Sequence, residues 1–146
     1  MKVQRSIDIA APPDKVWPFL AEPDKILEWY IPLQKLKYTS EQSREVDAPF
    51  YFEEKVTGGV IKLNCVVTEY IEKEKFAFKM TSGDMMKSYE EEWILKATPS
   101  GSLFAFMEQG KLGYGVVGRI IGPLAQRSSA ATVEKILAKL KSLVEA

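Results

Sequence analysis

A single long helix at the C-terminal end has to cover the apolar face of all the strands that this sequence predicts. This requirement constrains the fold more than any other feature. Apolar residues recur there at helical spacing, at Val133, Ile136, Leu137, Leu140 and Val144. The helical pattern extends back to about Val116, and Pro123 is expected to kink or restart the helix. A large sheet covered by one helix has to curl around it.

The order of the segments predicts the fold class. Alternation of apolar and polar residues and turn signals indicate strands at residues 3–9, 36–38, 50–56, 60–71, 76–80, 87–97 and 102–109. Two short helices separate the first two strands, beginning near Pro13 and Lys25. This order is typical of an α+β fold and not of βαβ alternation. We therefore predict one helix-grip domain over residues 1–146, with a seven-stranded curved antiparallel sheet wrapped around the C-terminal helix.

Composition excludes several classes of function. The chain has 20 basic and 20 acidic residues, so its neutral surface does not favour nucleic acid as a partner. It contains no histidine, and Cys65 is its only cysteine, which excludes Ser-His-Asp and Cys-His catalysis and His-based or Cys-rich metal sites. No apolar run is long enough to cross a membrane. The first residues contain no signal-peptide core, so a cytoplasmic location is expected.

Three stretches of sequence resemble a known superfamily. Residues 6–20 (SIDIAAPPDKVWPFL), with Glu28-Trp29 after them, resemble the opening of the START-like, or polyketide cyclase/dehydrase and lipid-transport, superfamily. Residues 101–106 (GSLFAF) are similar to its last hairpin, with Ser102 where threonine is commoner, and residues 118–124 open the long helix in the family manner. The superfamily includes lipid carriers, hormone receptors, cyclases and co-chaperone domains, so the resemblance implies a hydrophobic cavity but no particular reaction.

Aromatic and other apolar side chains share one face of the expected strands, and they are the candidate walls of such a cavity. The expected lining is Phe78, Met80, Tyr89, Trp93, Phe104 and Phe106 on the sheet, and Val117, Ile121 and Leu124 on the helix. Met85 and Met86 follow a glycine in a loop between two strands. Because methionine adapts to irregular apolar shapes, we expect this pair at the cavity entrance.

Polar residues interrupt this apolar face in one row. A four-residue turn at Thr98 to Gly101 sets Glu91 opposite Glu108. The family pairs the first strand with the last, and matching Ile7 with Phe106 then brings Arg5 opposite Glu108. We therefore expect Arg5, Glu91 and Glu108 to face inward, with Arg5 touching at least one of the two carboxylates.

Three interpretations of this row remain open. It is a buried ion cluster that fixes strand register, a polar cavity end that binds a ligand hydroxyl, amine or carbonyl, or a general acid–base site. The favoured function is binding or transport of a lipid-like or polycyclic molecule, without cofactor or metal. The alternatives are a cyclase or dehydratase that uses a pocket glutamate, and a protein-interaction domain. The sequence does not predict the oligomeric state.

Overall fold

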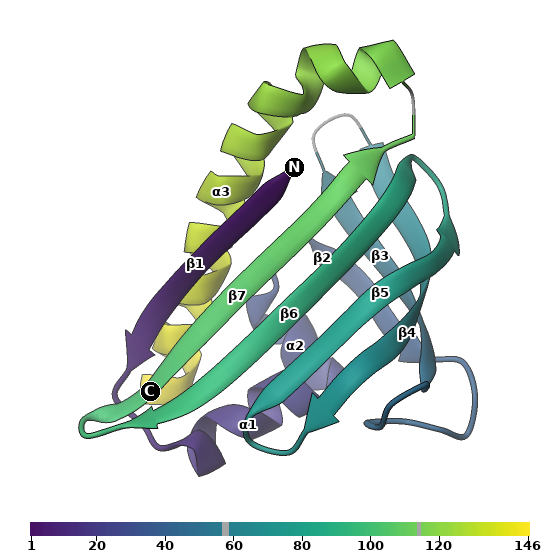
Figure 1. Ribbon diagram of the computed structural model, residues 1–146. Coiled ribbons are helices and arrows are strands. Elements are labelled where there is room, and N and C mark those ends of the chain that lie inside the picture. Colours follow the sequence, from purple (N-terminus) through teal and green to yellow (C-terminus); the bar gives the residue numbers. More distant parts are fainter. Residues whose placement is uncertain (57–58, 114) are drawn as a thin grey trace.

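The computed structural model describes the backbone of residues 1–56, 59–113 and 115–146, and the side chains of the same residues except 115–128. Figure 1 shows a curled sheet with the long C-terminal helix running along one side of it. The elements, in chain order, are β1 (Lys2–Ile9), α1 (Pro13–Ala21), α2 (Pro23–Trp29), β2 (Leu33–Tyr38), β3 (Pro49–Val56), β4 (Gly59–Ile71), β5 (Lys75–Gly83), β6 (Met86–Thr98), β7 (Gly101–Leu112) and α3 (Gly115–Glu145).

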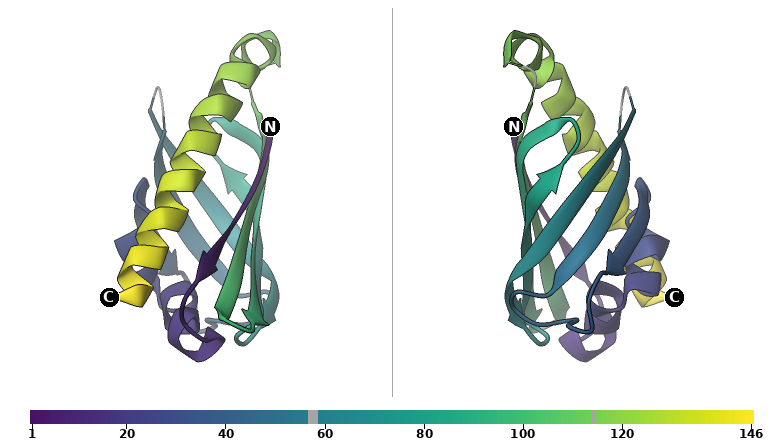
Figure 2. Two further views of the ribbon diagram at one scale, coloured as in Figure 1. Left: turned by 90° about the vertical axis from the view of Figure 1, so that its left-hand side faces the viewer. Right: turned by 90° about the vertical axis from the view of Figure 1, so that its right-hand side faces the viewer.

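The sheet has seven antiparallel strands in the order β1-β7-β6-β5-β4-β3-β2. Figure 2 shows α3 running along one side of the curled sheet, with α1 and α2 near the C-terminal end of α3. The predicted helix-grip architecture is therefore confirmed. Within the part of the chain that the structure describes, no helix is long and apolar enough to span a membrane.

The C-terminal half of α3 supplies the side of the core that faces the sheet. Its five predicted apolar residues, Val133, Ile136, Leu137, Leu140 and Val144, are all buried. The helix end is tied to β1 as well, because Glu145 accepts a hydrogen bond from the Ala10 backbone and Lys141 donates one to the Asp8 carbonyl. The helix does not restart at Pro123, since α3 is continuous over 31 residues. Figures 1 and 2 show instead that the first turns of α3 run at an angle to the rest, as expected for a kink, because an interior proline removes a backbone hydrogen bond and crowds the preceding turn.

The β6–β7 hairpin fixes the register on which the site depends. Thr98 pairs with Gly101, and Ala97 pairs with Ser102, as the turn residues predict. Gly101 has a φ of +146°, and a Cβ atom at this position would lie 2.2 Å from the Ile9 carbonyl oxygen. Only glycine therefore allows the hairpin to close against the end of β1.

Candidate functional site

Two glutamates face each other inside the sheet. Glu91 on β6 pairs with Glu108 on β7, as the predicted register requires, and Phe78 on β5 is the other neighbour of Glu91. Glu91 is 0% exposed and Glu108 is 5% exposed. Two carboxyl groups are therefore held side by side in an apolar interior that is rich in aromatic rings.

Three hydrogen-bond donors converge on Glu91. Its Oε2 atom accepts the Tyr30 hydroxyl at 2.7 Å and the Tyr89 hydroxyl at 2.5 Å. Its Oε1 atom accepts the indole N–H of Trp93 at 2.9 Å. Tyr30 comes from the end of α2, whereas Tyr89 and Trp93 are the neighbours of Glu91 on the same face of β6. The strand and the short helix thus complete one hydrogen-bond shell together.

The Tyr89 hydroxyl bridges the two glutamates. Its oxygen lies 2.5 Å from Glu91 Oε2 and 3.0 Å from Glu108 Oε2. Burial and the nearby carboxylates raise the pKa of Tyr89 well above its usual value, so the phenol keeps its single proton. One proton cannot serve two carboxylates, and one of the two contacts is repulsive if both are ionised. The geometry therefore requires one glutamate to carry a proton.

A third glutamate belongs to the same group. Glu54 on β3 is 7% exposed. Burial, and then the charges of Glu91 and Glu108, raise the pKa of Glu54 well above its usual value. The nearby Tyr30 hydroxyl, whose proton is donated to Glu91, offsets only part of this rise in the pKa of Glu54. We call these five residues, Tyr30, Glu54, Tyr89, Glu91 and Glu108, the carboxyl cluster.

Burial dominates the electrostatics of the carboxyl cluster. Desolvation, followed by the charge of Glu108, raises the pKa of Glu91 to about 8, and desolvation raises the pKa of Glu108 to about 7. Among the side chains that the structure describes, no lysine or arginine forms an ion pair with any of the three glutamates. The pair formed by Glu91 and Glu108 therefore keeps about one proton at neutral pH, as the bridging phenol requires.

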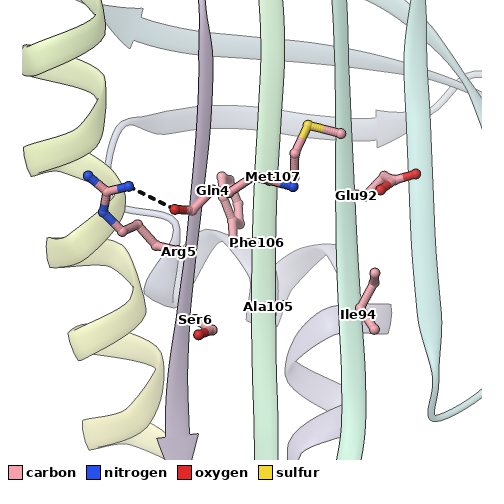
Figure 3. A pocket seen from close by; sticks show the side chains of 8 residues that line it. All are labelled: Gln4, Arg5, Ser6, Glu92, Ile94, Ala105, Phe106 and Met107. Carbon is pink, nitrogen blue, oxygen red and sulfur yellow. Dashed lines mark hydrogen bonds between the residues drawn. The ribbon is translucent and has the colours of Figure 1, made fainter.

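The prediction that Arg5 contacts Glu91 or Glu108 was wrong. Arg5 pairs with Phe106, and Val3 takes the position opposite Glu108. The Arg5 guanidinium is directed toward α3, where its Nε lies 3.3 Å from Glu134 Oε1, and its side chain is 43% exposed (Figure 3). The true register differs from the predicted one by two residues. Such a shift keeps every side chain on its own face, so burial alone could not distinguish the two registers.

The aromatic residues of the predicted lining pack tightly against one another. Phe78, Trp93, Phe104 and Phe106 are each at most 1% exposed. The Trp93 ring stacks on Phe106 at 6.2 Å between centroids and lies 5.1 Å from the ring of Trp29. These rings form a closely packed aromatic layer next to the carboxyl cluster, which we call the aromatic floor. Contact between them and a ligand stays a prediction.

Other predicted residues lie toward the end of the sheet where β5 turns into β6. Met80 is half-buried on the inner face, Met86 is buried, and Met85 sits in the turn with a positive φ of 66°. The Met85 sulfur lies beside Gly59 at the start of β4. Val117, Ile121 and Leu124 fall outside the described side chains. The expectation that Met85 and Met86 border an entrance remains untested.

A surface depression of about 250 Å³ lies on the outer face of the sheet. Gln4, Ser6, Glu92, Ile94, Ala105 and Met107 surround it, together with parts of Arg5 and Phe106 (Figure 3). It is separated from the carboxyl cluster by the strands themselves, because neighbouring residues point to opposite faces. It is therefore not the interior cavity that the sequence predicts.

The sequence of residues 1–145 matches a family model described as polyketide cyclase / dehydrase and lipid transport. The chain belongs to this family. Members of the family bind hydrophobic small molecules, so the fold is one that holds apolar ligands. A search of curated proteins found no match.

Solved structures show how widely the same fold is used. TTHA0849 from Thermus thermophilus has a TM-score of 0.83 at 17% identity, covering 99% of this chain and 97% of that one. A START superfamily protein from Mycobacterium smegmatis gives a TM-score of 0.76 at 12% identity, covering 97% and 98%. The Zhui aromatase/cyclase from Streptomyces sp. R1128 gives 0.75 at 14% identity, covering 100% and 96%. At these identities the likeness concerns the fold alone.

The sequence analysis did not identify two residues of the carboxyl cluster, Glu54 and Tyr30. Phe50, Phe52 and Glu54 alternate along β3, so Glu54 interrupts an apolar face in the same way as Glu91. That signal was present in the sequence. Tyr30 carried no such signal, because it lies at the end of α2 and reaches Glu91 across 61 residues of sequence.

Proposed function

We propose that this protein binds an apolar small molecule between the sheet and α3, with the molecule's polar end against the carboxyl cluster. The carboxyl cluster itself is the observation that carries the proposal. Three buried carboxyl groups are costly in an aromatic interior, and an apolar replacement of the same size would cost less. Clusters of this kind, with strongly shifted pKa values, are typical of functional sites.

The unequal burial of the three glutamates supports a direction of approach. Glu91 is 0% exposed, whereas Glu108 and Glu54 keep 5% and 7% of their surface. Glu54 and Glu108 are thus the outer members, and Glu91 lies beneath them with its oxygens already hydrogen-bonded. A ligand would meet Glu54 and Glu108 first, with Met80 beside it and the aromatic floor below.

Nile red titration tests this function and its location together. We expect the wild-type protein to bind this neutral apolar dye saturably at one site. Met80→Trp fills space beside the half-buried Met80 and should weaken binding at least about tenfold, which corresponds to about 1.4 kcal/mol. Ile71→Trp is the matched control, because Ile71 is 48% exposed on the neighbouring strand. Absence of saturable binding, or equal affinity of the Met80→Trp protein, would contradict the proposal.

One observation favours a second candidate function, an enzyme of the cyclase or dehydratase kind. Burial brings the pKa of Glu108 to about 7 and that of Glu91 to about 8, the range in which a carboxyl group exchanges protons well at neutral pH. Turnover of a polyketide-like substrate that is lost in Glu108→Gln would favour the enzyme. Binding without turnover would favour the carrier.

A further inference from the structure

Each hydroxyl or N–H donor that contacts Glu91 or Glu108 is already used by these two carboxyl groups. The hydroxyl of Tyr30 and the indole N–H of Trp93 point at Glu91, and the hydroxyl of Tyr89 lies between Glu91 and Glu108. The proton shared by the two glutamates is needed as well, because the Tyr89 hydroxyl can satisfy only one of them as a donor. The pair formed by Glu91 and Glu108 therefore has no spare donor to offer a ligand.

What remains is acceptor capacity on the outer glutamates. Glu108 uses Oε2 for Tyr89, and its Oε1 has no hydrogen-bond partner among the described residues. The side chain is nonetheless more than nine-tenths buried and faces the interior. In the described part of the chain, Thr98 Oγ1 is the only side-chain oxygen or nitrogen that is both sealed from solvent and unpartnered. The unpartnered Glu108 Oε1 is therefore not sealed from solvent, and an incoming ligand can reach it.

Building on the proposed function, we infer that the carboxyl cluster selects an apolar ligand whose buried end is a hydrogen-bond donor, either a hydroxyl or an amine. Such a group donates to Glu108 Oε1 and leaves every internal hydrogen bond in place. A ligand without a donor would bury Glu108 Oε1 as an unpaired acceptor, which costs free energy. A ligand that donates to this oxygen avoids that cost and should bind more tightly.

Ketones and carboxylates should bind more weakly than alcohols and amines, for two different reasons. A ketone brings only an acceptor, and the pair formed by Glu91 and Glu108 can donate to it only by withdrawing the shared proton from the bridge through Tyr89. A carboxylate brings a second negative charge against Glu54, Glu91 and Glu108, where burial already disfavours charge. The site therefore discriminates against fatty-acid anions, although their apolar chains suit the fold.

Proton release on binding distinguishes an amine ligand from a hydroxyl ligand. An ammonium group adjacent to Glu108 replaces the shared proton as the compensating charge, so an amine should release a proton when it binds. An alcohol should bind without proton release. Calorimetry in two buffers of different ionisation enthalpy measures the number of protons released for each ligand bound.

Five pyrene compounds of one skeleton test the inference by displacement of Nile red: pyrene, 1-pyrenemethanol, 1-pyrenemethylamine, 1-acetylpyrene and 1-pyrenecarboxylate. We expect the alcohol or the amine to bind about tenfold more tightly than the ketone and the carboxylate. Glu108→Gln should reduce this preference several-fold, because the glutamine amide adds a donor that a ketone can use. Glu90→Gln, on the exposed face of the neighbouring strand β6, should leave the preference unchanged.

The outcomes separate the two proposals. Equal affinities, tightest binding of the carboxylate, or a preference that survives Glu108→Gln would overturn the inference but leave the proposed function standing. If no pyrene compound displaces the dye and the dye itself does not bind saturably, the proposed function fails and the inference fails with it.

Discussion

Replacing Glu108 by glutamine should stabilise the protein at neutral pH and have a much smaller effect at pH 5. Glu108 has its pKa raised from 4.5 to about 7, so the folded state binds its proton more tightly than the unfolded chain does. Stability then falls as pH rises between these two values. A shift of this size corresponds to about 3 kcal/mol, at about 1.4 kcal/mol for each pH unit. Glutamine has nearly the shape of the protonated side chain and avoids that cost.

Urea unfolding followed by tryptophan fluorescence at pH 5, 6, 7 and 8 measures the effect. The chain has no histidine, but Glu91 and Glu54 also have raised pKa values and add to the pH dependence in this range. The contribution of Glu108 is therefore the difference between the wild-type and Glu108→Gln proteins. The wild-type protein should lose stability steadily with rising pH, and the Glu108→Gln protein should lose less. Glu90→Gln is the control and should follow the wild type. A wild-type stability that is constant or rises from pH 5 to 8 would refute the reasoning.

Three other substitutions probe single contacts, each measured as the free energy of unfolding at pH 7. Tyr89→Phe removes the bridge between the glutamates and should cost about 1–3 kcal/mol, and an unchanged stability would show that the bridge contributes nothing. Gly110→Ala should cost about 1–3 kcal/mol because its Cβ would lie 2.7 Å from Met86 Cε and 3.1 Å from the Tyr89 ring, and full tolerance would argue against tight packing there. Arg5→Met removes an exposed ion pair with Glu134 and should cost less than about 1 kcal/mol, whereas a larger loss would restore Arg5 as a buried counterion.

Local patterns predicted the fold because each element is specified by short-range chemistry. The alternation along β6 and β7, with the turn at Thr98 to Gly101, was sufficient to set Glu91 opposite Glu108. The spacing of Val133 to Val144 identified the buried face of α3. These features depend on residues near one another in sequence, and such features can be read without coordinates.

The site was predicted only in part, because its contacts join distant segments. The register between β1 and β7 has no connecting turn, and a two-residue shift satisfies the same burial pattern, so Arg5 was placed wrongly. Tyr30 reaches Glu91 from a helix end whose direction no periodicity reveals. Glu54 could have been found from the alternation of β3. Its proximity to Glu91 depends on the curl of the sheet, which brings β3 toward β6 across the interior, where the rings of Phe52 and Tyr89 lie 5.9 Å apart.

Native mass spectrometry of the protein purified from its own source tests the central claim most directly. The account predicts a bound apolar molecule in the spectrum, carrying a hydroxyl or amine group and lost at higher collision energy. The same purification of Met80→Trp should give mostly empty protein. A wild-type spectrum with only the bare polypeptide, or with a bound molecule that the Met80→Trp protein retains equally, would contradict the account.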